Sequence, residues 1–140
     1  MCDMIILSFD FGTTNIGVAV GQELTHTANA LTSIRSKNGV PNWYQIKKII
    51  EQWKPKYIIV GLPLNIDGTN QNITIKARKF AKSLQKMSIN VKLHDERLST
   101  VEAKSILFQK GGFKSLTKNN IDSFSAVLIL ESWFLNKNKL

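Results

Sequence analysis

The sequence has a single cysteine, Cys2, among its 140 residues. One cysteine excludes a framework of disulfides within the chain and fits the reducing cytosol. A chain of this length does not need disulfides, because a domain of about 150 residues buries roughly 68–70% of the surface that its unfolded chain exposes. We therefore expect one domain over residues 1–140, located in the cytoplasm.

Long hydrophobic runs are also lacking. No run reaches the ~20 apolar residues that a membrane-spanning helix requires. The apolar run near the N-terminus is short, follows no basic residues and is interrupted by Asp10, so it does not fit a signal peptide. The sequence therefore predicts neither a membrane anchor nor a targeting segment.

Acidic residues are scarce relative to basic ones. Ten acids stand against nineteen lysines and arginines, which leaves a net charge of +9. An excess of this size fits a polyanionic partner such as nucleic acid. The alternative is compositional, because the basic residues are mostly lysines and the chain is rich in Ile and Asn, the bias that an AT-rich genome imposes. The charge by itself leaves both explanations open.

The hydrophobic pattern predicts an α/β fold. Short apolar runs rich in β-branched residues indicate strands, and apolar positions three and four apart indicate helices. Three strands come first and strand–helix–strand units follow, which argues for one mixed five-stranded sheet with helices on both faces. The predicted strands span residues 4–10, 15–20, 28–35, 57–60 and 90–95, and the predicted helices span 41–54, 71–87, 99–109 and 120–135.

Most of the ten acids have an ordinary structural explanation. The Ser99-x-x-Glu102 pattern is a helix capping box, and Asp67-Gly68 fits a turn. We expect Glu23, Glu51 and Glu131 on solvated faces, and Asp3 near a frayed terminus. These residues need no functional role.

Three places remain: Asp10, the Asp95-Glu96 pair, in which Glu96 is the candidate, and Asp122. Asp10 ends one predicted parallel strand and Glu96 stands at the end of another, and the carboxyl ends of such strands form the functional crevice of open α/β sheets. Asp122 lies in register with the apolar stripe of the last predicted helix, which can bring it over the same edge. Each acid also has a structural alternative. Asp10 can be a residue of a hairpin turn, Glu96 an acid of a surface loop, and Asp122 a partner of the helix dipole.

Three carboxylates at one edge would repel one another unless cations bind between them. At ~5 Å and an effective dielectric constant of about 20, each pair repels by about 3 kcal/mol. Oxygen ligands without nitrogen or thiolate partners favour Mg²⁺ or Mn²⁺ over zinc. Neither His26 nor His94 has the spacing of a zinc ligand. The sequence therefore predicts a Mg²⁺ or Mn²⁺ site.

Four motifs in order resemble the YqgF (RuvX) family of bacterial proteins. They read FDFGTTNIGVAV, IIVGLPLNIDG, KLHDERLSTVEA and IDSFSAVLILES and extend over nearly the whole chain. The resemblance implies a ribonuclease H-like fold and a nuclease whose catalytic acids fall in the first, third and fourth motifs. The matching positions are Asp10, Glu96 and Asp122. One departure is Thr14-Asn15, which stands where many family members carry a basic residue.

The same resemblance implies a reaction and partners. The family is described as cleaving the 5′ end of precursor 16S ribosomal RNA, and alternatively as resolving Holliday junctions. We expect a phosphodiesterase of the endonuclease type with two metal ions held by the three acids. The expected partners are precursor rRNA, with branched DNA as the alternative, and ribosomal particles. We expect the protein to be a monomer or a weak homodimer.

The segment KGGFKSLTK is the predicted nucleic-acid-binding loop. Lys110, Lys114 and Lys118 recur every four positions and lead directly into Asp122. We expect this segment to order over the substrate on binding. Arg97, beside Glu96, is a fourth predicted nucleic-acid contact.

Two other functions compete with cleavage. The stretch FDFGTTN also looks like the first phosphate loop of the actin, hexokinase and heat-shock ATPase group. That group needs two such lobes, and this sequence contains one. The second competitor is a ribosome-assembly factor that binds RNA without cutting it, since three acids can also be structural.

Overall fold

The protein is built on a six-stranded mixed sheet, seen in a computed structural model that describes residues 4–98 and 123–137. The strand order is β4-β3-β2-β1-β5-β6, with β1 parallel to β5 and β5 parallel to β6. The first three strands form an antiparallel meander. The strands are β1 (Ile5–Asp10), β2 (Asn15–Gln22), β3 (Thr27–Lys37), β4 (Val40–Pro41), β5 (Tyr57–Leu62) and β6 (Val91–Asp95).

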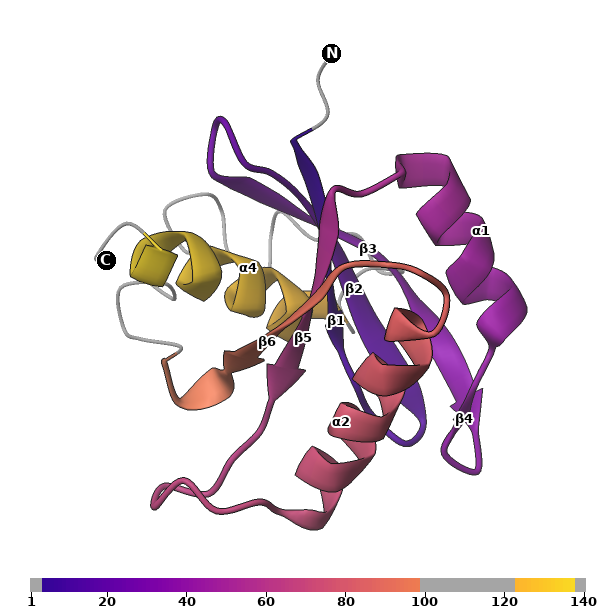
Figure 1. The fold of residues 1–140 in the computed structure, drawn as a ribbon, viewed down its shortest axis with the longest axis vertical. Coiled ribbons are helices and arrows are strands. Elements are labelled where there is room, and N and C mark those ends of the chain that lie inside the picture. The colour runs from indigo at the N-terminus through magenta and orange to yellow at the C-terminus, as the bar shows by residue number, and fades with distance from the viewer. Residues whose placement is uncertain (1–3, 99–122, 138–140) are drawn as a thin grey trace.

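Helices cover both faces of this sheet (Figure 1). Helices α1 (Trp43–Trp53) and α2 (Asn72–Gln85) lie on one face, and α4 (Phe124–Lys137) lies on the other. Each face has its own cluster of buried residues, one including Phe9, Ile46 and Phe80, the other including Ile6 and Leu130. The expected mixed α/β architecture is confirmed.

The alternation of side chains along β1 decides which face each residue serves. Leu7 and Phe9 belong to the core under α1 and α2, whereas Ile6 belongs to the core under α4. Ser8 also faces α4, because its hydroxyl donates a 2.8 Å hydrogen bond to the carbonyl of Ala126. Asp10 continues this second set and therefore points to the α4 side of the sheet.

The three parallel strands end at the same edge of the sheet. β1 ends at Asp10, β5 at Leu62 and β6 at Asp95, and the 3₁₀ turn η1 (Glu96–Leu98) follows β6 directly. This edge lies at the bottom of Figure 1, where the arrowhead of β5 points. The parallel pairing therefore brings Asp10 of the first motif and Glu96 of the third motif to the same edge.

The region before α1 differs from the prediction. Residues 36–40 are not a plain loop, because Lys37 pairs with Val40 in a short β3–β4 hairpin, and β4 adds a sixth strand. Pro41 ends β4 and does not open the helix. The helix begins after Asn42, whose side chain accepts a 3.2 Å hydrogen bond from the backbone N–H of Gln45. An asparagine cap outweighs the preference of proline for a helix start.

Three expectations about burial and strand length were wrong. Glu131 is not solvated; it is 3% exposed on α4. Glu23 is also engaged, since its carboxylate accepts a 2.8 Å hydrogen bond from the hydroxyl of Tyr57. β5 extends to Leu62, two residues further than predicted, so Gly61 belongs to a fully buried strand.

Some predictions concern residues outside the described ranges. They are the helix over 99–109 with its capping box, the start of the last helix at residue 120, and the segment 110–118. Within the described ranges, every helix is too short or too polar to cross a bilayer.

Candidate active site: two carboxylates at the sheet edge

Asp10 occupies the last position of β1, opposite Gly17 of β2. Burial raises the pKa of its carboxyl group, and a hydrogen bond from the side chain of Ser125 on α4 lowers it, with burial the larger cause. The net pKa is raised. A raised pKa means that the protein around Asp10 does not compensate the negative charge fully.

Glu96 lies next to Asp10 in the fold, although 86 residues separate them in the chain. Burial, together with the negative charges of Asp10 and Asp95, raises the pKa of Glu96 to about 7. Its Oε2 atom is buried and has no hydrogen-bond partner among the described residues. A buried carboxylate oxygen without a donor is costly, and it is a free ligand position.

Gly61 of β5 makes room for this carboxylate. A Cβ atom at residue 61 would lie 2.8 Å from Glu96 Oε2 and 2.5 Å from the Cδ1 of Ile129 on α4. Real Cβ atoms do not approach heavy atoms so closely, so any side chain here would displace Glu96 or α4. The missing side chain of Gly61 therefore lets β5, Glu96 and α4 meet.

Serines attach the beginning of α4 to the same edge of the sheet. The register of β2 against β3 shifts between Ile16 and Val18, and beside this shift the N–H of Val18 donates to a side chain outside the sheet. The hydroxyl of Ser123 accepts that N–H at 2.9 Å and donates to the carbonyl of Leu31 at 2.6 Å. Residue 123 is thus held beside the strand that pairs with Asp10.

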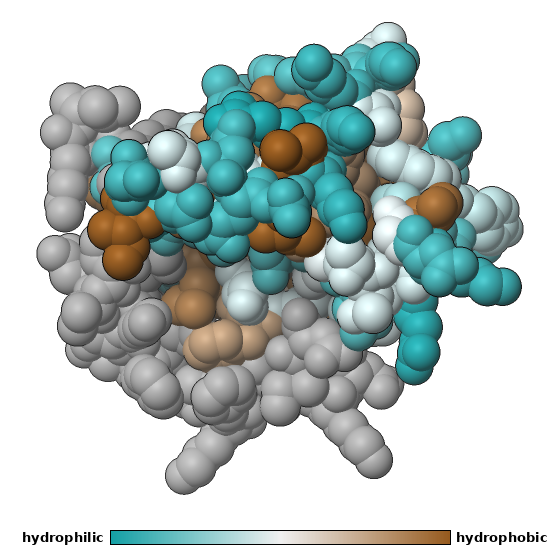
Figure 2. Space-filling view, turned by 90° about the horizontal axis from the view of Figure 1, so that it is seen from below, coloured by the Kyte–Doolittle hydropathy of each residue, from teal (hydrophilic) through white to brown (hydrophobic). Residues whose placement is uncertain are grey.

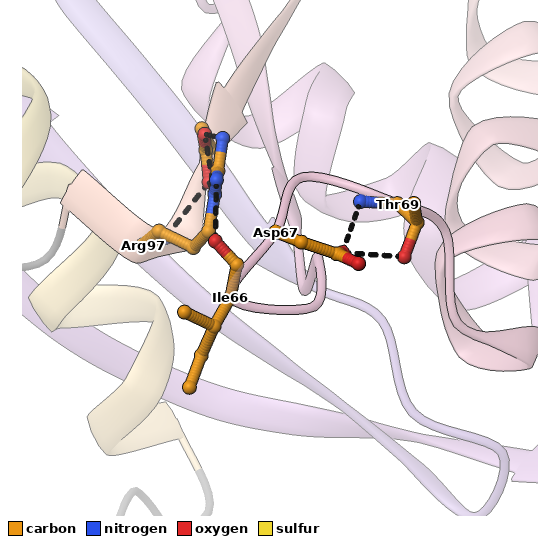
Figure 3. A network of polar contacts seen from close by, with 5 residues as sticks. Ile66, Asp67, Thr69 and Arg97 are labelled. Atoms are coloured by element: carbon orange, nitrogen blue, oxygen red, sulfur yellow. Dashed lines mark hydrogen bonds and ion pairs between the residues drawn. The ribbon is translucent and has the colours of Figure 1, made fainter.

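Arg97 ties a neighbouring loop to the site (Figure 3). Its guanidinium forms a 2.7 Å ion pair with Asp95 and donates a 3.0 Å hydrogen bond to the carbonyl of Ile66. The loop after β5 has its own bonds, because the carboxylate of Asp67 accepts from the N–H and the hydroxyl of Thr69. The expected turn at Asp67-Gly68 is confirmed, with Gly68 at φ +91°. Arg97 therefore already has protein partners.

The predicted site residues are only partly described. Asp10, Glu96 and Arg97 come together at one edge, whereas Asp122, Lys110, Lys114 and Lys118 lie outside the described residues. Within residues 4–98 and 123–137 no group of three or more histidines, cysteines or acids gathers in a metal-binding arrangement. The two carboxylates still fit a hard cation, because both are oxygen donors with raised pKa values and one oxygen lacks a donor.

Figure 2 views the molecule from below Figure 1, toward the ends of the parallel strands, and its described part is mostly hydrophilic with separate hydrophobic patches. The loop that Arg97 holds carries an exposed apolar side chain, Ile66, which is 96% exposed.

Sequence reasoning missed three residues of the site: Gly61, Ser123 and Ser125. All three stand inside the quoted motifs, but hydrophobic periodicity gives no signal for them. Ser125 could have been found by its position three residues after Asp122, a spacing that puts two side chains on one face of a helix. Gly61 could have been found as a glycine inside an apolar strand, which often marks a close approach.

The fold resembles that of junction resolvases. RuvC of Thermus thermophilus, solved in complex with a Holliday junction substrate, superposes with a TM-score of 0.61 at 14% sequence identity and covers 96% of both chains. The Holliday junction resolvase of fowlpox virus gives a TM-score of 0.51 at 16% identity, over 95% of this chain and 99% of that one. These likenesses define a ribonuclease H-like fold, as expected.

Sequence comparison then gives the family. The chain belongs to the RuvX family, whose model is described as Holliday junction resolvase and matches residues 4–136. A protein of Pectobacterium atrosepticum named "Putative pre-16S rRNA nuclease" is 54% identical over 96% of this chain and 97% of its own length. A protein of the same name from Photorhabdus laumondii is 55% identical over the same shares. The predicted family is confirmed.

Proposed function

We propose that this protein is a metal-dependent nuclease that cleaves structured nucleic acid, with the 5′ end of precursor 16S rRNA as its substrate. The observation that carries the proposal is the pair formed by Asp10 and Glu96. Two half-buried carboxylates with raised pKa values lie together at a sheet edge, and Glu96 Oε2 has no donor among the described residues. A cation would relieve the cost of ionising both.

The proposed ligands are the carboxylates of Asp10, Glu96 and Asp122. Asp122 is included because of the sequence motif and because of its neighbour Ser123, whose hydroxyl bonds to β2 and β3 beside Asp10. Two bound Mg²⁺ or Mn²⁺ ions would supply a water nucleophile of lowered pKa and charge stabilisation at the leaving oxygen. Gly61 keeps space for the Glu96 carboxylate, and Ser125 orients Asp10.

The names of the most similar relatives favour precursor rRNA over a DNA junction as the proposed substrate. The two proteins named above carry the rRNA name at 54% and 55% identity, whereas the junction-bound resolvase is 14% identical. The proposal includes ribosomal particles as partners, a cytoplasmic location and a monomer or weak homodimer. The net charge of +9 supports a polyanionic substrate.

The decisive experiment compares two substrates and two readouts. Wild type, Asp10→Asn and the control Glu51→Gln are incubated with a 5′-extended 16S rRNA fragment or a four-way DNA junction, with Mn²⁺ or with chelator. Glu51 is exposed on α1, on the other face of the sheet, so its variant should behave as wild type. Thermal melting with and without Mn²⁺ reports metal binding independently of cleavage.

We expect Mn²⁺-dependent cleavage of the RNA and a Mn²⁺-dependent rise in melting temperature, both lost in Asp10→Asn. Cleavage of the DNA junction but not of the RNA would show that the proposed substrate is wrong, whereas the proposed metal site would stand. RNA binding without cleavage or metal stabilisation in the wild type would overturn the proposal in favour of a non-cleaving assembly factor.

A further inference from the structure

A pocket of about 270 Å³ opens on the opposite face of the sheet from the two carboxylates. It lies between α2, the first residue of α1 and the β3–β4 hairpin, and its walls include Phe11, Trp43 and Phe80. The three rings are packed together, with centroid distances of 5.3 Å between Phe11 and Phe80 and 5.5 Å between Trp43 and Phe80. Of the three, Trp43 keeps part of its surface exposed, so it is the ring that a planar ligand can stack on.

The rim of this pocket is cationic. Lys76 and Lys79 stand three positions apart on α2, both are exposed, and both line the pocket. Asn38 and Ser83 add an amide and a hydroxyl, and no acid is found among the described residues that line it. An aromatic wall beside two ammonium groups suits a group that has a flat ring and a negative charge.

The pocket also begins one residue away from the candidate active site. Phe11 follows Asp10 directly, so their α-carbons are about 3.8 Å apart. Asp10 points to the α4 face, whereas Phe11 belongs to the core cluster of the α1 and α2 face. A strand of nucleic acid that passes over the sheet edge can therefore reach both places.

We infer that this pocket binds one unpaired nucleotide of the nucleic-acid substrate. The base stacks on Trp43, and the flanking phosphate contacts Lys76 and Lys79. The volume is at the small end for ligand pockets, which fits one base and excludes a duplex. This inference rests on the proposed function, and it goes further by assigning a single-stranded segment of the substrate to a defined place.

The test uses a fluorescent RNA hairpin with a short single-stranded 5′ extension, and measures binding by anisotropy in the presence of chelator. Each nucleotide of the extension is replaced in turn by an abasic one. In the wild type we expect one position at which removal of the base weakens binding about tenfold. In the Trp43→Leu variant, the same abasic replacement should hardly change the binding affinity. The Trp43→Phe variant keeps an aromatic ring, so its affinity should again be sensitive to that replacement.

The lysines have a matched control on their own helix. Lys76→Ala/Lys79→Ala and Lys82→Ala/Lys86→Ala remove the same charge from exposed positions of α2 or its end, but only the first pair lines the pocket. We expect the first double variant to make the slope of log K against log salt shallower by about 0.7 for each phosphate that is no longer neutralised. The second should leave the slope near that of the wild type.

The outcomes separate this inference from the proposed function. No base-sensitive position in the wild type, or equal abasic effects in wild type and Trp43→Leu, would overturn the pocket while cleavage stands. Equal salt slopes in the two lysine variants would overturn the phosphate contact. A wild type that shows the base-sensitive position but never cleaves would confirm the pocket and refute the nuclease.

Discussion

Gly61 and Glu96 are in contact across the edge of the sheet, with space for no further atom between them. A Cβ at residue 61 would lie 2.8 Å from Glu96 Oε2 and 3.1 Å from its Cδ. A strand position without a side chain thereby determines where a half-buried carboxylate lies. The relationship makes Gly61 a positioning residue for the proposed site.

Gly61→Ala should therefore impair cleavage more than it impairs folding. The new methyl group must displace Glu96 or Ile129, and a misplacement of about 1 Å at a catalytic group can cost about 100-fold in rate. Overpacking should also lower the free energy of unfolding by about 1–3 kcal/mol. Cleavage rate per folded molecule and the affinity for Mn²⁺ by calorimetry are the measurements.

Gly21→Ala is the matched control for this substitution. Its Cβ would meet Leu130 at 3.0 Å and the carbonyl of Thr27 at 3.1 Å, so it strains the packing of α4 on the sheet away from the carboxylates. We expect it to be destabilised but to keep its affinity for Mn²⁺. Equal losses of affinity in the two variants would show that Gly61 acts only through general packing.

The raised pKa of Glu96 predicts how stability depends on pH without metal. The folded pKa is about 7 and the ordinary value is 4.5, so between these values the unfolded chain binds fewer protons than the folded one. The free energy of unfolding must then fall as pH rises from about 4.5 to 7, and level off above 7. The fall is at most about 3 kcal/mol and is reduced by solvent screening, because Glu96 is only partly buried.

Glu96→Gln should remove this pH dependence and make the protein more stable than wild type at pH 8 in chelator. Urea unfolding at several pH values measures both effects, and Glu51→Gln serves as the control because it is exposed on α1. Asp10 adds a fall in the same direction from its own raised pKa. Parallel pH profiles for wild type and Glu96→Gln would contradict the assignment of a charged, uncompensated carboxylate.

Arg97 allows a test between a tether and a phosphate contact. Its fork holds Asp95 and the carbonyl of Ile66 together, a geometry that lysine cannot reproduce although it keeps the charge. If Arg97 acts as a tether, Arg97→Lys should be as harmful as Arg97→Ala, and amide exchange at residues 65–69 should speed up in both. Full rescue of RNA binding by lysine, with unchanged exchange, would favour the phosphate contact that the sequence predicts.

The lysines of residues 110–118 remain a prediction from the sequence. Changing Lys110, Lys114 and Lys118 to alanine should make the salt slope of binding shallower by about 2 for single strands and about 3 for duplex. Cleavage at saturating substrate should survive, because no acid is removed. Lys47→Ala/Lys48→Ala/Lys82→Ala carries the same charge change on exposed helix positions and is the control. Equal slopes in the two triple variants would assign the effect to net charge alone.

The sequence by itself determined five of the six described strands and placed Asp10 and Glu96 at the carboxyl edge of the sheet. The mostly apolar strand β1 ends in Asp10 and carries this information locally, because a buried strand needs apolar residues and a charge can appear only where it ends. Glu96 follows a strand of mixed composition, β6, in which Lys92 and Leu93 are exposed. The four motifs are also short continuous stretches of the sequence, and their order along the chain led to the correct family and fold.

Only the tertiary structure decided which side chains meet. Gly61 lies against Glu96, Arg97 bonds to Ile66, and Ser123 bonds to Val18 beside a shift of register between β2 and β3. Each of these three contacts joins segments that are far apart in the chain. Periodicity tells which face a residue takes, but the partner on that face is set by how α4 and the strands pack in three dimensions.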